Sequence, residues 1–152
     1  CSAKKDAAGR AHHVGLGRVM AGPTQWSQGF VHVDELAPMS PTKGHFSANL
    51  YLKLPSEGGH LELWPLQFES RWEFYTNAHT LSKLVSIDEE AQRELRARLP
   101  PPVLLEVAPG DLVMLSVQRP HAVQGWTSGD SRASLQSFVN FAGDDAALTL
   151  EA

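Results

Sequence analysis

The residues with the clearest chemical potential lie in one stretch near the end of the chain. There His121 is followed eleven residues later by Arg132, and Ser134 comes two residues after that. A histidine can bind a metal ion, and a guanidinium matches the far carboxylate of a metal-bound dicarboxylate with two parallel hydrogen bonds. On a strand, Ser134 points to the same face as Arg132, so its hydroxyl can add a bond to that carboxylate.

A second pair of potential metal ligands lies upstream, at His32 and Asp34. The segment 30–34 alternates as a strand does, so these two side chains leave the same face toward one ion. With His121 they supply two imidazoles and one carboxylate, a facial triad that suits Fe(II) and leaves adjacent coordination positions open. A 2-oxo acid can take two of those positions and dioxygen a third. Arg132 favours an oxo acid with a second carboxylate, such as 2-oxoglutarate.

Other interpretations of these residues stay open. His60 and Glu62 have the spacing of His32 and Asp34, but they begin directly at a turn and could equally be a solvated face beside leucines. His32 and Asp34 could form an edge-strand pair at the surface. Arg132 could be a surface arginine at the start of a strand.

Length and composition define the class of protein. The 152 residues predict one domain, and 42% hydrophobic with 20% charged residues is ordinary for a soluble globular protein. A net charge of -4 argues against a nucleic-acid surface, and the single cysteine, Cys1, excludes an internal disulfide framework. The polar start is no signal peptide, and no apolar run is long enough to span a bilayer. We therefore expect a cytoplasmic protein with a small-molecule substrate and no nucleic-acid or membrane partner. The sequence leaves the oligomeric state open.

The elements that must position the candidate ligands are mostly strands. Strands are expected over residues 12–20, 30–34, 46–54, 60–64, 103–107, 112–117, 121–126 and 132–141. Turn residues at 55–59 predict that 46–54 and 60–64 form a hairpin. Short strands separated by turn signals favour an antiparallel sandwich or jelly roll.

One inserted helix is expected over 87–99. A capping box formed by Ser86 and Glu89 would open it, and the triple proline at 100–102 would end it. Residues 1–11 predict a disordered leader ahead of one domain at 12–152, and residues 65–80 are expected to be irregular.

Several of these pieces, in this order, resemble the Fe(II)/2-oxoglutarate-dependent oxygenase superfamily. The matching pieces are His32-Val-Asp34, Asn49-Leu-Tyr-Leu-Lys53 with the Gly58-Gly59 turn, Gly110-Asp-Leu-Val-Met-Leu115, His121-Ala-Val-Gln-Gly125 and Arg132-Ala-Ser134. The chain looks most similar to the branch that acts on free amino acids and related small metabolites. The resemblance implies a double-stranded β-helix of the cupin-like kind, and hydroxylation of a C–H bond with succinate and carbon dioxide as co-products.

The resemblance also implies roles for single residues. His32, Asp34 and His121 would hold iron, while Arg132 and Ser134 would bind 2-oxoglutarate. The face of strand 46–54 that carries Asn49 and Tyr51 lines the cavity in this family, so either side chain could bond the co-substrate. Both could equally lie on the polar outside of the sheet. Trp64 and Trp126 could wall the pocket, although tryptophans in a small domain are more often core.

Some relatives in that branch are halogenases, which replace the carboxylate ligand with a small residue. Asp34 fills that position here, so hydroxylation is favoured over halogenation, while desaturation or cyclisation would use the same site. Such enzymes usually carry N-terminal helices, and the chain has no room for them ahead of His12, so we expect that part to be missing. Substrate contacts are expected from loops 21–29, 35–45 and 65–80.

Two classes of protein remain as alternatives. A cupin-type metal enzyme that uses no oxo acid would need the triad but would have no use for Arg132. A truncated jelly-roll module without catalytic activity would keep the fold and lose the metal.

Overall fold

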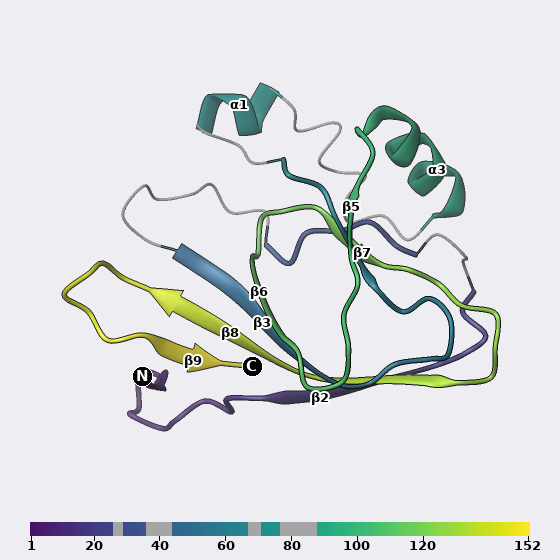
Figure 1. Cartoon of the computed structure of the whole chain (residues 1–152). Helices are drawn as coiled ribbons and strands as arrows, with labels where there is room; N and C mark the ends of the chain where they lie inside the picture. Colours follow the sequence, from purple (N-terminus) through teal and green to yellow (C-terminus); the bar gives the residue numbers. More distant parts are fainter. Residues whose placement is uncertain (26–28, 36–43, 67–70, 77–87) are drawn as a thin grey trace.

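The computed structural model describes residues 1–25, 29–35, 44–66, 71–76 and 88–152. Most of its regular elements are strands in two sheets, and the described helices lie together at one end of the molecule (Figure 1). Neither described helix is long and apolar enough to cross a membrane.

The larger sheet is built around the long strand β8. Its strands are β1 (Ser2–Ala3), β2 (Leu16–Ala21), β3 (Gly44–Lys53), β6 (Leu112–Ser116), β8 (Ser131–Phe141) and β9 (Thr149–Glu151). They run in the order β1-β9-β8-β3-β6, and β2 also pairs with β8. Strand β8 is antiparallel to β2, β3 and β9. The strands expected over 12–20, 46–54, 112–117 and 132–141 are confirmed here, with shifted ends.

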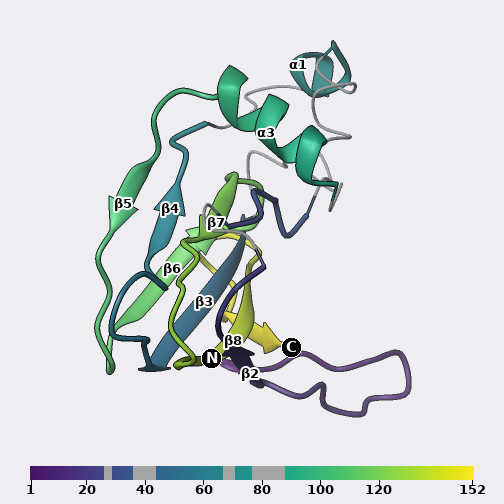
Figure 2. The ribbon, with the colours of Figure 1, turned by 90° about the vertical axis from the view of Figure 1, so that its right-hand side faces the viewer.

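The smaller sheet is formed by three short antiparallel strands. They are β4 (Leu61–Leu63), β5 (Val103–Leu105) and β7 (His121–Val123), in the order β5-β4-β7. Figure 2 shows this sheet beside the strands of the larger one, with helix α3 (Glu89–Arg98) above it. The chain passes from one sheet to the other and back, as β3, then β4 and β5, then β6, β7 and β8. The predicted double-stranded β-helix is confirmed.

The predicted hairpin between 46–54 and 60–64 is wrong, because the two segments belong to different sheets. Strand β3 pairs with β6 and β8, whereas β4 pairs with β5 and β7. The turn between them contains Gly58 and Gly59 with φ of 71° and 72°, a backbone conformation that favours glycine. A Cβ atom on Gly58 would lie 2.3 Å from the carbonyl oxygen of Gly125. The turn therefore sends the chain across the core instead of back along β3.

Three other expectations are corrected. Residues 1–11, for which the sequence predicts a disordered leader, contain β1, which pairs in parallel with β9. The region 65–80 contains a short helix, α1 (Arg71–Thr76). Helix α3 begins at Glu89, and its N-cap is Asp88, whose carboxylate accepts a bond from the amide of Ala91 at 2.8 Å. Ser86 and Ile87, the predicted start, lie outside the described residues.

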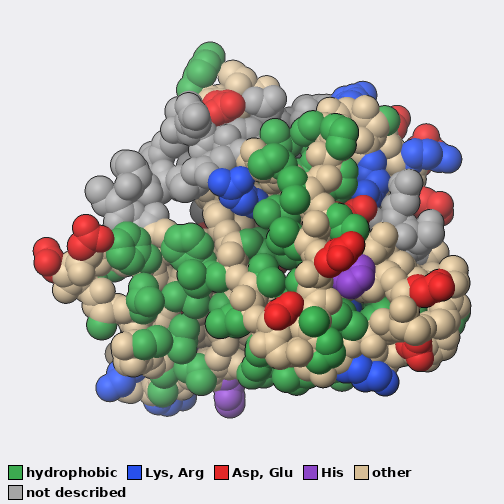
Figure 3. Space-filling view, in the orientation of Figure 1, with side chains coloured by type: hydrophobic (Ala, Val, Ile, Leu, Met, Phe, Trp, Pro, Cys, Tyr) green, Lys and Arg blue, Asp and Glu red, His purple; other side chains and the backbone are tan. Residues whose placement is uncertain are grey.

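Both faces of the larger sheet carry apolar residues. On β3 the side chains of Ser47 and Tyr51 point inward and are buried, whereas Leu52 is 56% exposed. Leu112 and Met114 on β6 are exposed as well. Hydrophobic side chains also gather over the region of β3, β6 and β8 on the face seen in Figure 3. The inward face, with its mixture of polar and aromatic groups, is the one that faces the smaller sheet.

Segment 30–34 is not a regular strand, although the sequence predicts one. It forms a single bridge, in which His32 and His121 exchange both backbone hydrogen bonds at 2.9 Å. On its other edge the side chain of Gln92 replaces a neighbouring strand. It accepts from the amide of Val31 at 2.7 Å and donates to the carbonyl of Val31 at 3.0 Å. Helix α3 therefore fixes the segment that carries two of the candidate ligands.

We expect Gln92→Leu to lower the free energy of unfolding by about 2–4 kcal/mol. The substitution leaves a buried N–H and a buried C=O of Val31 unpaired, and each such group costs about 1–3 kcal/mol. Val31 is fully buried and Gln92 is 4% exposed, so water cannot replace the lost bonds. Urea unfolding monitored by tryptophan fluorescence measures the change. The exposed Arg98→Leu on the same helix serves as control, and an equal loss in both variants would contradict the assignment.

Candidate metal centre and its pocket

The structure brings His32, Asp34 and His121 together. The ligand atoms of the three side chains all lie within 4.8 Å of one another. The Nε2 atom of His32 is 3.8 Å from one oxygen of Asp34, and that of His121 is 3.8 Å from the other. The backbone bridge between His32 and His121 sets this geometry, because it places one imidazole directly across from the other, with ring centroids 4.3 Å apart.

Both imidazoles are oriented by the backbone. Nδ1 of His32 lies 3.1 Å from the carbonyl oxygen of Phe30, and Nδ1 of His121 lies 2.9 Å from that of Arg119. A carbonyl oxygen only accepts, so in each ring Nδ1 carries a proton, and in the neutral imidazole Nε2 is the atom with the lone pair. Metal-binding histidines are held in this way, with the outer nitrogen donating to a carbonyl or a carboxylate. The two Nε2 lone pairs therefore face Asp34.

The carboxylate of Asp34 is the third candidate ligand and is mostly buried. Its side chain is 10% exposed, and its Oδ2 atom is buried with no hydrogen-bond partner among the described residues. A buried anionic oxygen without a partner is costly unless a cation or a donor meets it. Burial, and secondly the charge of His121, lower the pKa of His32, so its imidazole is neutral at neutral pH. Two imidazoles and one carboxylate match the donor set that Fe(II) takes in a facial triad.

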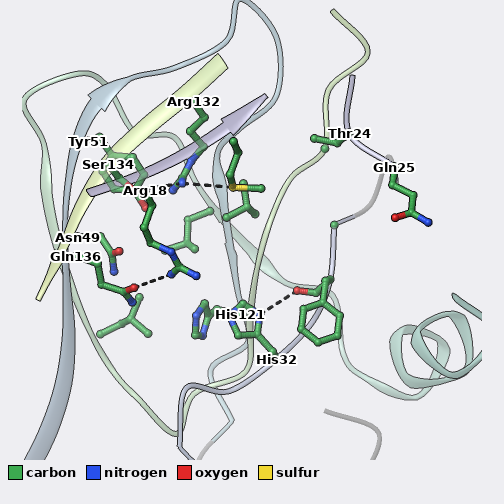
Figure 4. A pocket seen from close by; sticks show the side chains of 17 residues that line it. Arg18, Thr24, Gln25, His32, Asn49, Tyr51, His121, Arg132, Ser134 and Gln136 are labelled. Atoms are coloured by element: carbon green, nitrogen blue, oxygen red, sulfur yellow. Dashed lines mark hydrogen bonds between the residues drawn. The ribbon is translucent and has the colours of Figure 1, made fainter. Parts of the chain in front are cut away.

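A cavity of about 440 Å³ opens beside the histidines, between the inner faces of the two sheets. Phe30, Leu61, Leu115 and Val123 supply apolar walls, and at the end away from His32 and His121 lies Arg132 (Figure 4).

Arg132 is a buried cation whose contacts with described residues are with neutral groups. It is 5% exposed, and burial is the main cause that lowers its pKa. Its Nε donates to the carbonyl of Gly59 at 3.2 Å, and one terminal nitrogen lies 3.5 Å from Ser134 Oγ. Its guanidinium stacks 4.9 Å from the centre of the Tyr51 ring. Within the part of the chain that the structure describes, no carboxylate pairs with it. An anion bound in the cavity would supply the missing charge.

The residues predicted to accompany Arg132 lie beside it. Ser134 and Tyr51 are buried, Asn49 is partly buried, and all three line the cavity. The face of β3 that carries Asn49 and Tyr51 is thus the cavity face, which resolves the two alternatives left by the sequence. Burial is the main cause that raises the pKa of the Tyr51 hydroxyl, so this group remains a donor at neutral pH.

Sequence reasoning missed two polar residues of the cavity, Arg18 on β2 and Gln136 on β8. Arg18 pairs across the strands with Ser134, so it shares the inward face. Its Nη1 donates to the side-chain oxygen of Gln136 at 2.6 Å. Arg18 also contributes, as a lesser cause, to the lowered pKa of His32 and of Arg132. The pattern Arg132-x-Ser134-x-Gln136 on one strand could have indicated Gln136, but only the strand pairing reveals Arg18.

The alternative metal pair is engaged elsewhere. His60 accepts a bond from the amide of Val107, and Glu62 forms an ion pair with Arg96 at 2.8 Å. Trp64 and Trp126 are buried at 1% and 3% exposure and do not line the cavity, so both belong to the core. Of the predicted substrate loops, 21–29 contributes Thr24, Gln25 and Gly29 to the cavity. Residues 36–43 of loop 35–45, and residues 67–70 and 77–80 of loop 65–80, lie outside the described residues.

The fold is similar to that of solved dioxygenase structures. A crystal structure of an N-substituted L-amino acid dioxygenase from Burkholderia ambifaria AMMD superposes with a TM-score of 0.62 at 15% identity, covering 99% of this chain and 57% of that one. A structure of such an enzyme in complex with alpha-KG, from the same organism, gives 0.57 at 17% identity, with coverages of 91% and 52%. The chain therefore spans little more than half the length of these two proteins. No protein-family model matches the sequence, and no curated protein matches it.

Proposed function

We propose that this protein is an Fe(II)- and 2-oxoglutarate-dependent dioxygenase that hydroxylates a C–H bond of a small, amino-acid-like molecule. One observation carries the proposal. The two histidines of a His-Asp-His cluster, whose carboxylate has an unpartnered oxygen, line the same cavity as a buried arginine that has no counter-charge among the described residues. The first is a site for a cation, and the second is a site for an anion.

The candidate metal ligands and the other polar residues of the cavity would have different roles. His32, Asp34 and His121 would hold the iron, which supplies the chemistry that activates dioxygen. Arg132 would bind the distal carboxylate of 2-oxoglutarate, with the hydroxyls of Ser134 and Tyr51 as further donors. Together they would orient the oxo acid with its reacting end toward the metal. The apolar walls would keep water from the reacting groups.

The dioxygenases of similar fold support this assignment. Their name specifies dioxygenation of N-substituted L-amino acids, and one was solved in complex with alpha-KG, which is 2-oxoglutarate. The presence of Asp34 in the cluster favours hydroxylation over halogenation, because a carboxylate occupies the ligand position that a halide would need. Succinate and carbon dioxide would be the co-products.

Anaerobic titration of the purified protein, first with Fe(II) and then with 2-oxoglutarate, tests the proposal. We expect a visible charge-transfer band to appear when the oxo acid chelates the bound iron. Iron binding without such a band would favour a cupin-type metal enzyme that uses no oxo acid. No bound iron would indicate a non-catalytic jelly-roll module.

A further inference from the structure

A second arginine, Arg18, faces the cavity between the two sites described above. In Figure 4 its guanidinium lies between Arg132 and the two histidines. Arg18 lines the same cavity as His32, His121 and Arg132. Its guanidinium donates a hydrogen bond to a neutral oxygen, that of Gln136. It forms no ion pair with any described residue.

Arg18 is held in place by a buried chain of polar groups. Gln136 accepts from Arg18 with its oxygen and donates with its nitrogen to Ser47 Oγ at 2.8 Å. Ser47 also receives a bond from the side chain of Asn49 at 3.0 Å. Ser47 and Gln136 are 1% and 5% exposed. Because the amide nitrogen of Gln136 is engaged by Ser47, its oxygen is fixed toward Arg18, and the guanidinium keeps further donors for another partner.

The two arginines differ in their access to solvent. Arg132 is 5% exposed, whereas Arg18 is an exposed residue of β2. A ligand that meets Arg132 therefore sits deep in the cavity, and a ligand that meets Arg18 sits nearer its opening. Met20, Phe30 and Val123 line the same cavity as Arg18 and give it apolar walls. Such surroundings suit an acid with an apolar body.

We propose that Arg18 binds the carboxylate of the primary substrate, and that this substrate is a carboxylic acid with an apolar body. The inference rests on the proposed function, because it takes Arg132 as the site of 2-oxoglutarate. The cavity would then hold two carboxylates, one on each arginine, with the apolar part of the substrate against Phe30 and Val123. Arg18 would select acids over their neutral amides.

Binding of N-acetyl-L-leucine and of N-acetyl-L-leucinamide to the full chain tests this. The two probes share their apolar body and differ only in the carboxylate. Isothermal titration calorimetry would use protein loaded with Mn(II), which binds like iron without turnover, and 2-oxoglutarate. We expect the acid to bind at least about tenfold more tightly than the amide, because hydrogen bonds to a charged group contribute about 1.5–3 kcal/mol.

The variant Arg18→Gln should lower the affinity for the acid by about tenfold or more and leave that for the amide unchanged. Arg93→Gln, at an exposed arginine of α3, is the matched control and should change neither. Equal affinities for acid and amide would overturn the proposal, and so would no binding of the acid to the wild type.

The affinity for 2-oxoglutarate, measured with the same variants, separates this inference from the proposed function. It should be unaffected by Arg18→Gln. A large loss would assign Arg18 to the co-substrate and overturn the inference, although the proposed function would stand. If the wild type bound no 2-oxoglutarate but still preferred the acid through Arg18, the proposed function would fail and the carboxylate site would remain.

Discussion

Replacing Arg132 with methionine is expected to weaken binding of 2-oxoglutarate to the iron-loaded protein by about 30-fold or more. Truncating one partner of a buried, hydrogen-bonded charge pair costs about 2–5 kcal/mol, and about 1.4 kcal/mol corresponds to tenfold in affinity. Arg132 is 5% exposed, so water cannot take over its role. The anaerobic titration gives the dissociation constant directly. The affinity for Fe(II) should not change, because the metal ligands lie at the other end of the cavity.

A second oxo acid provides the control for this experiment. 2-Oxobutyrate keeps the group that chelates the metal and lacks the distal carboxylate. We expect Arg132→Met to leave its affinity unchanged, so that the two oxo acids become nearly equal. Equal losses for both acids would mean that Arg132 supports the fold through Gly59 and Tyr51 instead of binding the co-substrate. Arg132→Lys should give an intermediate result, because it keeps the charge and loses the fork.

His121→Ala is expected to weaken Fe(II) binding by more than about 100-fold. Mutating a residue that only hydrogen-bonds to a metal ligand costs roughly 10–100-fold in metal affinity. The loss should be larger here, because the variant removes one of the three metal ligands and only Asp34 and His32 remain. Asp34→Ala should act in the same direction. Equilibrium dialysis with Fe(II) under nitrogen measures the change.

The histidine His13 supplies the matched control for metal binding, because it is exposed and does not line the cavity. His13→Ala should bind iron as the wild type does. Circular dichroism of His121→Ala must show the wild-type fold, because the backbone bridge to His32 does not depend on the imidazole. Iron binding retained in a folded His121→Ala protein would place the metal elsewhere.

The candidate site could be predicted well from the sequence where it depends on local geometry. His32 and Asp34, and likewise Arg132 and Ser134, lie two residues apart, and a period of two places such pairs on one face of extended backbone. In the structure His32, Arg132 and Ser134 line one cavity, and Asp34 lies beside His32. The sequence predicts the strand of Asn49 and Tyr51, which is β3, but a period of two alone cannot tell the inside of a sheet from its outside.

The features that could not be predicted depend on contacts between distant parts of the chain. The hairpin expected around residues 55–59 was wrong because the strand partners of β3 are β6 and β8, far along the sequence. Arg18 was missed for the same reason, since only its pairing with Ser134 brings it into the cavity. The alternation of segment 30–34 predicts a strand. On one edge its backbone hydrogen bonds go to the side chain of Gln92, and a pattern of alternating residues cannot predict such a partner.

The bonds between Gln92 and Val31 have a consequence for hydrogen exchange. The amide of Val31 can exchange with deuterated water only when Gln92 releases it, so helix α3 must move away from the segment that carries His32 and Asp34. A ligand that binds only the folded state adds its binding energy to every opening that breaks its site. An ion held by His32 and Asp34 would therefore slow exchange at Val31 and in the turn of α3 around Gln92. A helix that contributes no metal ligand would thus report whether the metal is bound.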